Sequence, residues 1–196
     1  MRMMSGRLIA IAAGAVLFLG FSTASRADDL QSASAKPAVS DAPQRYELRL
    51  HHLHTGEDID IVYRIGDTYI PAALDRLNHF LRDHRTQDVS SYDPKEFDLL
   101  HTLMASLGRA NGVIDIVCGY RTPWSNNFLR TRSASTGVAE HSQHMLGKAI
   151  DIRVPGVTTV TLRNAALALH AGGVGFYPVS QFVHVDVGPV RTWSYR

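Results

Sequence analysis

Two histidines and one aspartate, drawn from two distant segments of the 196-residue chain, are of the types that bind a divalent metal ion. In the segment from His141 to Asp151, His144 and Asp151 flank Gly147, where the backbone is free to turn. Imidazole nitrogen and carboxylate oxygen are both ligands that Zn²⁺ accepts. We therefore expect two ligands here, His144 at the end of a loop and Asp151 on the strand that follows.

A third ligand is expected from a strand near residue 184, where polar and apolar residues alternate. Alternate residues of a strand face the same way. His184 and Asp186 therefore share one face, while Val183, Val185 and Val187 pack on the other. Three protein ligands leave the fourth position of a tetrahedral zinc ion open, which is typical of catalytic zinc sites.

These two segments resemble a known family of zinc peptidases. The pattern Ser142-x-His144-x-x-Gly147-x-Ala149-x-Asp151, followed by His184 in an apolar strand, is similar to the zinc D-Ala-D-Ala peptidases of the VanX and VanY type. Within that group the similarity is greatest to the MepK-like murein endopeptidases. It runs from about residue 50 to residue 193 and is supported by the segments 53–57, 77–83, 119–121, 171–178 and 182–186.

The resemblance implies a function and a role for four residues. His144, Asp151 and His184 match the zinc ligands, and Arg121 matches an arginine that steadies the oxyanion, which agrees with the effect of a cation beside developing negative charge. The implied activity is zinc-dependent hydrolysis of peptide cross-links in peptidoglycan, during cell wall remodelling. The bond joins two diaminopimelate residues, or D-Ala and diaminopimelate. The implied fold is similar to that of hedgehog proteins and D-Ala-D-Ala peptidases.

The sequence departs from the family at the expected general base. VanX-like and VanY-like enzymes carry Glu or His three positions before the last zinc histidine, and this chain has Gln181 there. Two roles are open for Asp186: it is the catalytic base, or it orients a ligand histidine from outside the metal shell. His141, three residues before His144, is a weaker candidate for the base.

Three other functions compete with the endopeptidase. A D,D- or L,D-carboxypeptidase would trim stem peptides and would need a wall or a cation for a terminal carboxylate. A non-catalytic peptidoglycan-binding module would explain the glutamine at position 181. A cysteine hydrolase would use Cys118, the single cysteine, but the apolar run 113–118 favours a buried and inert thiol.

The elements that must position these residues predict an α+β domain with a small, mostly antiparallel sheet and flanking helices. Alternation over 46–53 and 59–63 predicts a hairpin. Periodicity predicts a helix that starts at Pro71, a second that starts at Pro94 with Asp93 as its N-cap, and a third over 158–171 that is capped by Gly172 and Gly173. A short helix is expected over 124–130, and strands over 114–118, 148–154, 174–177 and 182–187.

Five further histidines lie in the first half of the chain. His51, His52 and His54 could form a metal cluster, but a solvated turn is favoured, and His79 and His84 are interpreted as residues on the surface of a helix.

The first 44 residues predict export. Arg2 and Arg7 precede an apolar run over 8–21 and small residues at 25–27, so residues 1–27 are interpreted as a signal peptide of the general secretory type. Residues 28–44 are expected to form a flexible linker, and 45–196 the zinc peptidase domain. We expect a periplasmic protein whose partner is peptidoglycan, with no stable membrane span after cleavage. A net charge of only +2 does not indicate a nucleic-acid partner.

Overall fold

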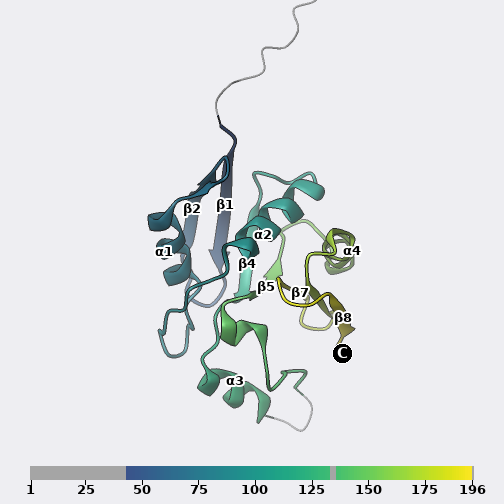
Figure 1. The fold of residues 1–196 in the computed structure, drawn as a ribbon. Helices are drawn as coiled ribbons and strands as arrows, with labels where there is room; N and C mark the ends of the chain where they lie inside the picture. The colour runs from purple at the N-terminus through teal and green to yellow at the C-terminus, as the bar shows by residue number, and fades with distance from the viewer. Residues whose placement is uncertain (1–42, 133–135, 196) are drawn as a thin grey trace, which may run out of the picture. The chain divides into compact units, whose positions relative to one another are not determined.

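A computed structural model describes residues 43–132 and 136–195. In this part of the chain eight strands form one sheet in the order β3-β2-β1-β4-β5-β7-β6-β8 (Figure 1). The strands are β1 (Arg45–His52), β2 (Asp58–Ile65), β3 (Thr68–Tyr69), β4 (Val113–Cys118), β5 (Ala149–Arg153), β6 (Gly173–Tyr177), β7 (Phe182–Asp186) and β8 (Arg191–Ser194). The helices are α1 (Pro71–Phe80), α2 (Pro94–Ser106), α3 (Pro123–Arg130), the 3₁₀ helix η1 (Gln143–Leu146) and α4 (Thr159–Leu169).

The α+β class is confirmed, but the sheet is mixed and extends beyond the second half of the chain. β1 pairs with β4 in parallel, and β6 pairs with β8 in parallel, whereas the other neighbours are antiparallel. The connection through α1 and α2 lets β4 run in the same direction as β1. The predicted first hairpin is therefore part of the sheet that carries the candidate site.

The helix boundaries follow from residues at their ends. Pro71 occupies the first turn of α1, and the Asp93 side chain accepts a hydrogen bond from the Lys95 backbone at the start of α2, as predicted. The predicted cap of α4 is wrong: His170, in the left-handed conformation with φ 50°, ends this helix. Gly172 is needed for another reason, because a Cβ there would lie 1.8 Å from the backbone oxygen of Asp186.

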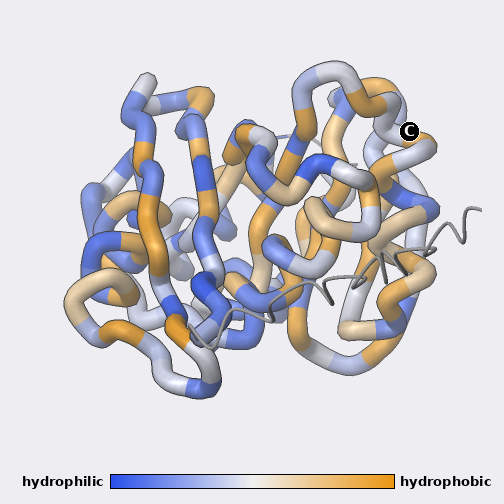
Figure 2. The backbone as a smooth tube through the Cα atoms, turned by 90° about the horizontal axis from the view of Figure 1, so that it is seen from above, coloured by the Kyte–Doolittle hydropathy of each residue, from blue (hydrophilic) through white to orange (hydrophobic). Residues whose placement is uncertain are grey.

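One hydrophobic core lies between the sheet and the helices that pack on it. α1 packs on β2, α2 on β1, and α4 on β6 and β7. Val183 and Val185 of β7 belong to this core, so His184 and Asp186 face the other way, as the alternation predicts. Figure 2 shows hydrophobic and hydrophilic positions interleaved along the backbone. The face of β7 opposite the core therefore carries polar side chains.

The predicted signal peptide, and the predicted linker up to residue 42, lie outside the described residues. No helix in the described ranges is long and apolar enough to cross a membrane. The short strands β3 and β8 are additions to the predicted elements, and β8 contributes to the site described next.

Candidate metal centre

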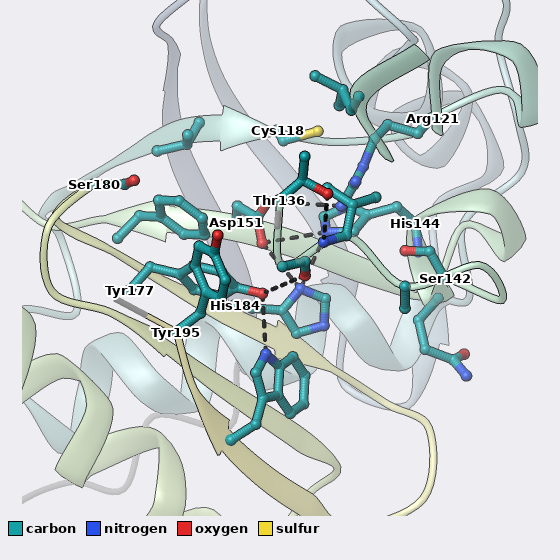
Figure 3. Close-up of a pocket in the computed structure, with 18 of the residues that line it drawn as sticks. Cys118, Arg121, Thr136, Ser142, His144, Asp151, Tyr177, Ser180, His184 and Tyr195 are labelled. Atoms are coloured by element: carbon teal, nitrogen blue, oxygen red, sulfur yellow. Dashed lines mark hydrogen bonds and ion pairs between the residues drawn. The ribbon is translucent and has the colours of Figure 1, made fainter. Parts of the chain in front are cut away.

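The side chains of His144, Asp151 and His184 point toward one another (Figure 3). His144 Nε2 lies 3.2 Å from Asp151 Oδ1 and 3.1 Å from His184 Nδ1, and the distance between Asp151 Oδ1 and His184 Nδ1 is 2.9 Å. Ligands at 2.0–2.1 Å from a tetrahedral zinc ion lie about 3.3 Å apart. The triangle therefore has nearly the size that such an ion requires.

Partners outside the triangle determine which nitrogen of each histidine is free. His144 Nδ1 donates to the Gly119 carbonyl at 2.8 Å, and His184 Nε2 donates to Asp186 Oδ2 at 2.9 Å. Their other ring nitrogens, which face Asp151, then carry lone pairs in the neutral imidazoles. Two nitrogen lone pairs and a carboxylate oxygen converge with no donor between them. This donor set fits a metal cation.

Two paired strands and one short helix position the three side chains. Asp151 on β5 and His184 on β7 are directly opposite each other in an antiparallel ladder. His144 lies in η1, where the Ser142 hydroxyl accepts from the His144 backbone. Gly147 ends η1 with φ 62°, and a Cβ there would lie 2.4 Å from the Ser91 carbonyl oxygen. The predicted turn at Gly147 is confirmed.

The protonation equilibria of His144 and Asp151 favour metal binding, whereas hydrogen bonds from Asp151 and Asp186 outweigh burial and raise the pKa of His184. Burial, and then the charge of Arg121, lowers the pKa of His144 to about 4, so its imidazole is neutral at pH 7. Burial opposes ionisation of Asp151, but the adjacent His144 and His184 outweigh it and hold the pKa of its carboxyl far below the usual value. Neutral imidazole and ionised carboxylate are the forms that ligate metals.

Asp186 lies behind His184, on the side away from the triangle. Besides His184, it accepts from the Gly173 and Gly188 backbone at 3.0 and 2.8 Å and from both Nη atoms of Arg191 at 3.0 and 2.8 Å. Its residue surface is 0% exposed. Burial raises the pKa of Asp186, but the bonds from His184 and Arg191 lower it well below the usual range. A carboxylate so held is a poor proton acceptor.

Arg121 reaches the triangle from the segment before α3. It is 8% exposed, and its Nη2 lies 3.9 Å from Asp151 Oδ2. Its Nη1 donates to Asn126 Oδ1 at 3.4 Å, whereas its buried Nε has no hydrogen-bond partner in the described residues. The guanidinium therefore keeps donor capacity directed into a buried polar site.

Cys118 is a geometric alternative to one ligand, because its sulfur lies within 4.8 Å of the candidate ligand atoms of His144 and Asp151. Burial raises the pKa of the Cys118 thiol to about 11, and its sulfur contacts the Gly119 carbonyl at 3.6 Å. His184 Nδ1, at 2.9 and 3.1 Å from the other two ligand atoms, completes a tighter triangle than the sulfur does.

The triangle lies in a cavity of about 310 Å³ that extends to both sides of it along the sheet. On the β1–β4 side, its lining includes His54, His84 and Arg85; we call these three residues the basic side. On the β6–β8 side, its lining includes Tyr177, Phe182 and Trp193; we call these three the aromatic side. His141 also lines the cavity and is exposed.

The sequence interpretation is wrong for His52 and His84, whereas His54 is exposed in a turn and His79 is exposed on α1, as predicted. His84 lies in a turn after α1, and its ring stacks on that of His54 with centroids 4.1 Å apart. His52 is 0% exposed and contacts Phe80 edge-on. The long connection from β1 to β4 folds these residues together, and a local polar pattern carries no sign of such a contact.

The aromatic side was missed because it depends on the parallel pairing of β8 with β6. Gly175 pairs with both His184 and Trp193, and the indole lies over this glycine. Trp193 Nε1 donates to the Tyr177 hydroxyl at 3.0 Å, and the Trp193 and His184 ring centroids are 5.0 Å apart. Gln181 is exposed in the β6–β7 turn and lines a different depression, with Asp115 and Arg153.

Comparisons with known proteins identify similar sequences. The model of the family described as "Peptidoglycan L,D-endopeptidase MepK" matches residues 40–193. The chain is 44% identical over 156 residues to the peptidoglycan L,D-endopeptidase MepK of Escherichia coli K12, which covers 80% of this chain and 84% of the relative. It is 40% identical over 157 residues to the probable peptidoglycan L,D-endopeptidase MepK of Haemophilus influenzae, and the match covers 80% of this chain and 83% of the relative. No solved structure matches the chain significantly.

Proposed function

Since the chain belongs to the peptidoglycan L,D-endopeptidase MepK family and is a murein endopeptidase that cleaves peptide cross-links, we propose that it does so with a zinc ion held by His144, Asp151 and His184. The observation that carries this proposal is the convergence of two imidazole lone pairs and one carboxylate oxygen within 3.2 Å of one another. Mixed nitrogen and oxygen ligands favour zinc among the common divalent metals.

The chain's own side chains have separate tasks in this proposal. When bound, zinc supplies Lewis acidity, which polarises a carbonyl and lowers the pKa of water from 15.7 to about 7. The Arg121 guanidinium, with its unpartnered Nε, binds the carbonyl oxygen as negative charge develops there. Burial of Arg121 strengthens that interaction, because little water competes for the same donor.

Of the two roles that the sequence leaves open for Asp186, we propose the orienting one. Its oxygens accept five hydrogen bonds, and it approaches His184 from behind. It thereby fixes the tautomer in which His184 Nδ1 is free for the metal. His141, which lines the cavity, remains the candidate base named from the sequence.

We also propose that the bond cleaved joins an L-centre to a D-centre in a diaminopimelate-containing cross-link, as the name of the relatives indicates. The substrate lies outside the cytoplasmic membrane, so we propose export to the periplasm after cleavage of residues 1–27. The basic and apolar residues at the start of the chain support this step.

Digestion of purified cross-linked muropeptide dimers tests the proposed activity. We expect monomeric products, their loss with a chelator, and their recovery when zinc is added back. Release of only a terminal residue would identify a carboxypeptidase, and binding of sacculi without soluble product from zinc-loaded protein would identify a binding module. Either result would overturn the proposal.

His184→Ala tests the metal centre in the same assay. We expect loss of both the bound zinc and the hydrolysis, because two ligands bind zinc far less tightly than three. His79→Ala is the matched control, since His79 is exposed on α1 and does not line the cavity. A His184→Ala protein that retains zinc at the wild-type ratio would contradict the assignment.

A further inference from the structure

Arg85 carries a positive charge into the cavity without an acidic partner. Its Nη1 is buried and has no hydrogen-bond partner, and its guanidinium has no ion pair within the described residues. Arg82, three residues earlier, is different: it donates to both carboxylate oxygens of Glu57, at 2.9 and 3.2 Å, and to Gln87 at 2.8 Å. A buried guanidinium N–H without an acceptor is unfavourable.

The nearby acid, Asp83, bonds backbone and hydroxyl groups and makes no ion pair with the Arg85 guanidinium. Asp83 Oδ1 accepts from the Arg85 backbone at 2.9 Å, and Asp83 Oδ2 accepts from the Thr122 backbone and hydroxyl, both at 2.9 Å. Asp83 is 0% exposed. These bonds tie the turn that carries Arg85 to the segment that carries Arg121.

The cavity around Arg85 is short of negative charge. Asp151 is the one carboxylate among the described residues that line it, and we assign its Oδ1 to the metal. Residues 133–135, which lie outside the described ranges, are Ser, Ala and Ser and carry no carboxylate. Arg85 and Arg121 therefore enter one cavity together, and an anion between or beside them would be stabilised by both.

We propose that Arg85 forms a subsite for a substrate carboxylate next to the scissile bond, beside Arg121, which binds the carbonyl oxygen of that bond. This inference rests on the proposed function. In a cross-link whose amide nitrogen belongs to diaminopimelate, a free carboxylate is attached to the same carbon as that nitrogen. Its distance from the reacting carbonyl is a few bonds, which suits an arginine on the wall beside the metal triangle. A planar guanidinium matches a carboxylate with two parallel hydrogen bonds.

Amidation of that carboxylate provides the test, because it removes the charge and changes little else. Two cross-linked dimers are compared, one with the free carboxylate and one with the carboxamide, on wild type, Arg85→Ala and Arg85→Lys. We expect wild type to prefer the free acid by roughly 10- to 100-fold in kcat/KM. We expect Arg85→Ala to reduce this preference to within about threefold and Arg85→Lys to restore part of it.

The ratio of two substrates on one enzyme sample does not depend on how much of that sample is folded. Arg76→Ala is the control for loss of an arginine, because Arg76 is exposed on α1 and does not line this cavity. An Arg85→Ala ratio equal to the wild-type ratio would overturn the subsite. If zinc-loaded wild type cleaves neither dimer, the proposed function fails instead, and the two failures are distinct.

A monomeric stem peptide distinguishes the source of the carboxylate. Arg85 would also suit the terminal carboxylate of an uncross-linked chain. We expect wild type to release no terminal residue from the monomer. Release that depends on Arg85, without any dependence of dimer cleavage on Arg85, would overturn the assignment to the cross-link.

Discussion

On the aromatic side of the metal triangle the polar groups are paired with one another, whereas on the basic side several are not. Trp193 Nε1 bonds the Tyr177 hydroxyl, and Arg191 bonds Asp186, which in turn holds His184. On the other side, Arg85 Nη1 and His52 Nε2 are buried and have no hydrogen-bond partner in the described part of the chain. The His52 ring lies next to that of His84, with centroids 6.1 Å apart. The difference indicates that the aromatic side holds a metal ligand in place, whereas the basic side has donors available for substrate.

Asp186→Ala should have the largest effect, because it removes the acceptor on which the paired side depends. It leaves His184, Arg191 and two backbone N–H groups without their partner. We expect the free energy of unfolding to fall by about 3 kcal/mol or more and the zinc affinity to fall about 10- to 100-fold. Urea unfolding and competition with a chromophoric chelator measure the two quantities.

The control for Asp186→Ala is Asp60→Ala, which removes an exposed carboxylate on β2 that pairs with Arg49. This change should alter the free energy of unfolding by less than about 1 kcal/mol. If the two variants bound zinc equally well, His184 would not depend on Asp186, and the distinction between the two sides would lose its basis.

Acid should destabilise the region around His52, whose buried Nε2 has no hydrogen-bond partner among the described residues. Burial, and then the charge of His54, lowers the pKa of His52 to about 4, below 6.5 for an unfolded histidine. Between pH 6.5 and pH 4 the unfolded chain binds a proton that the folded chain does not. The free energy of unfolding should therefore decrease as the pH falls through this window, by at most about 3 kcal/mol from this group.

Urea unfolding of wild type and His52→Gln at pH 7 and pH 4.5 isolates this contribution. The decrease between the two pH values should be smaller for His52→Gln than for wild type. Equal decreases would mean that His52 binds its proton equally well in the folded and the unfolded protein. The unpartnered Nε2 would then have no effect on the pH dependence of stability.

Gly175→Ala tests how closely the aromatic side is packed. A Cβ at this position would lie 2.6 Å from two carbons of the Trp193 ring, so the indole must shift from its present position. We expect about 1 to 2 kcal/mol of destabilisation, measured by thermal and urea unfolding, together with a raised KM for the dimer. Gly112→Ala is the control, because its nearest contact is the flexible end of Met104 at 2.9 Å. A wild-type KM in Gly175→Ala would show that the indole does not contact substrate.

Cys118→Ser should have the smallest effect. Cys118 lies between the two sides, and its thiol, with a pKa of about 11, stays protonated near neutral pH. We expect zinc content to be unchanged and activity to stay within about threefold of wild type. Loss of zinc from this variant would move the third ligand from His184 to Cys118.

Local signals account for much of what the sequence predicts correctly. Proline at a helix start, a capping aspartate and alternating valines each act within a few residues, and the structure confirms the helices at Pro71 and Pro94 and the core-facing Val183 and Val185. The motif also predicts that His144, Asp151 and His184 come together, although their function as ligands stays a prediction.

Contacts distant in sequence account for what was missed. β8 is short and largely exposed, and its place at the edge of the sheet depends on pairing with β6. Arg85 has no motif around it, and it reaches the cavity because Asp83 bonds Thr122, 39 residues away. Neither partner can be identified from the residues that surround the other.

The buried Asp83 carboxylate also joins the two backbone segments that carry Arg85 and Arg121 before any substrate arrives. It anchors the backbone of Arg85 through one oxygen and the residue after Arg121 through the other. Because the backbone of both segments is fixed in this way, less conformational entropy is lost when the two arginines bind substrate. The Asp83 carboxylate would thus help to match the positions of the two arginines to those of the free carboxylate and the scissile bond in the substrate.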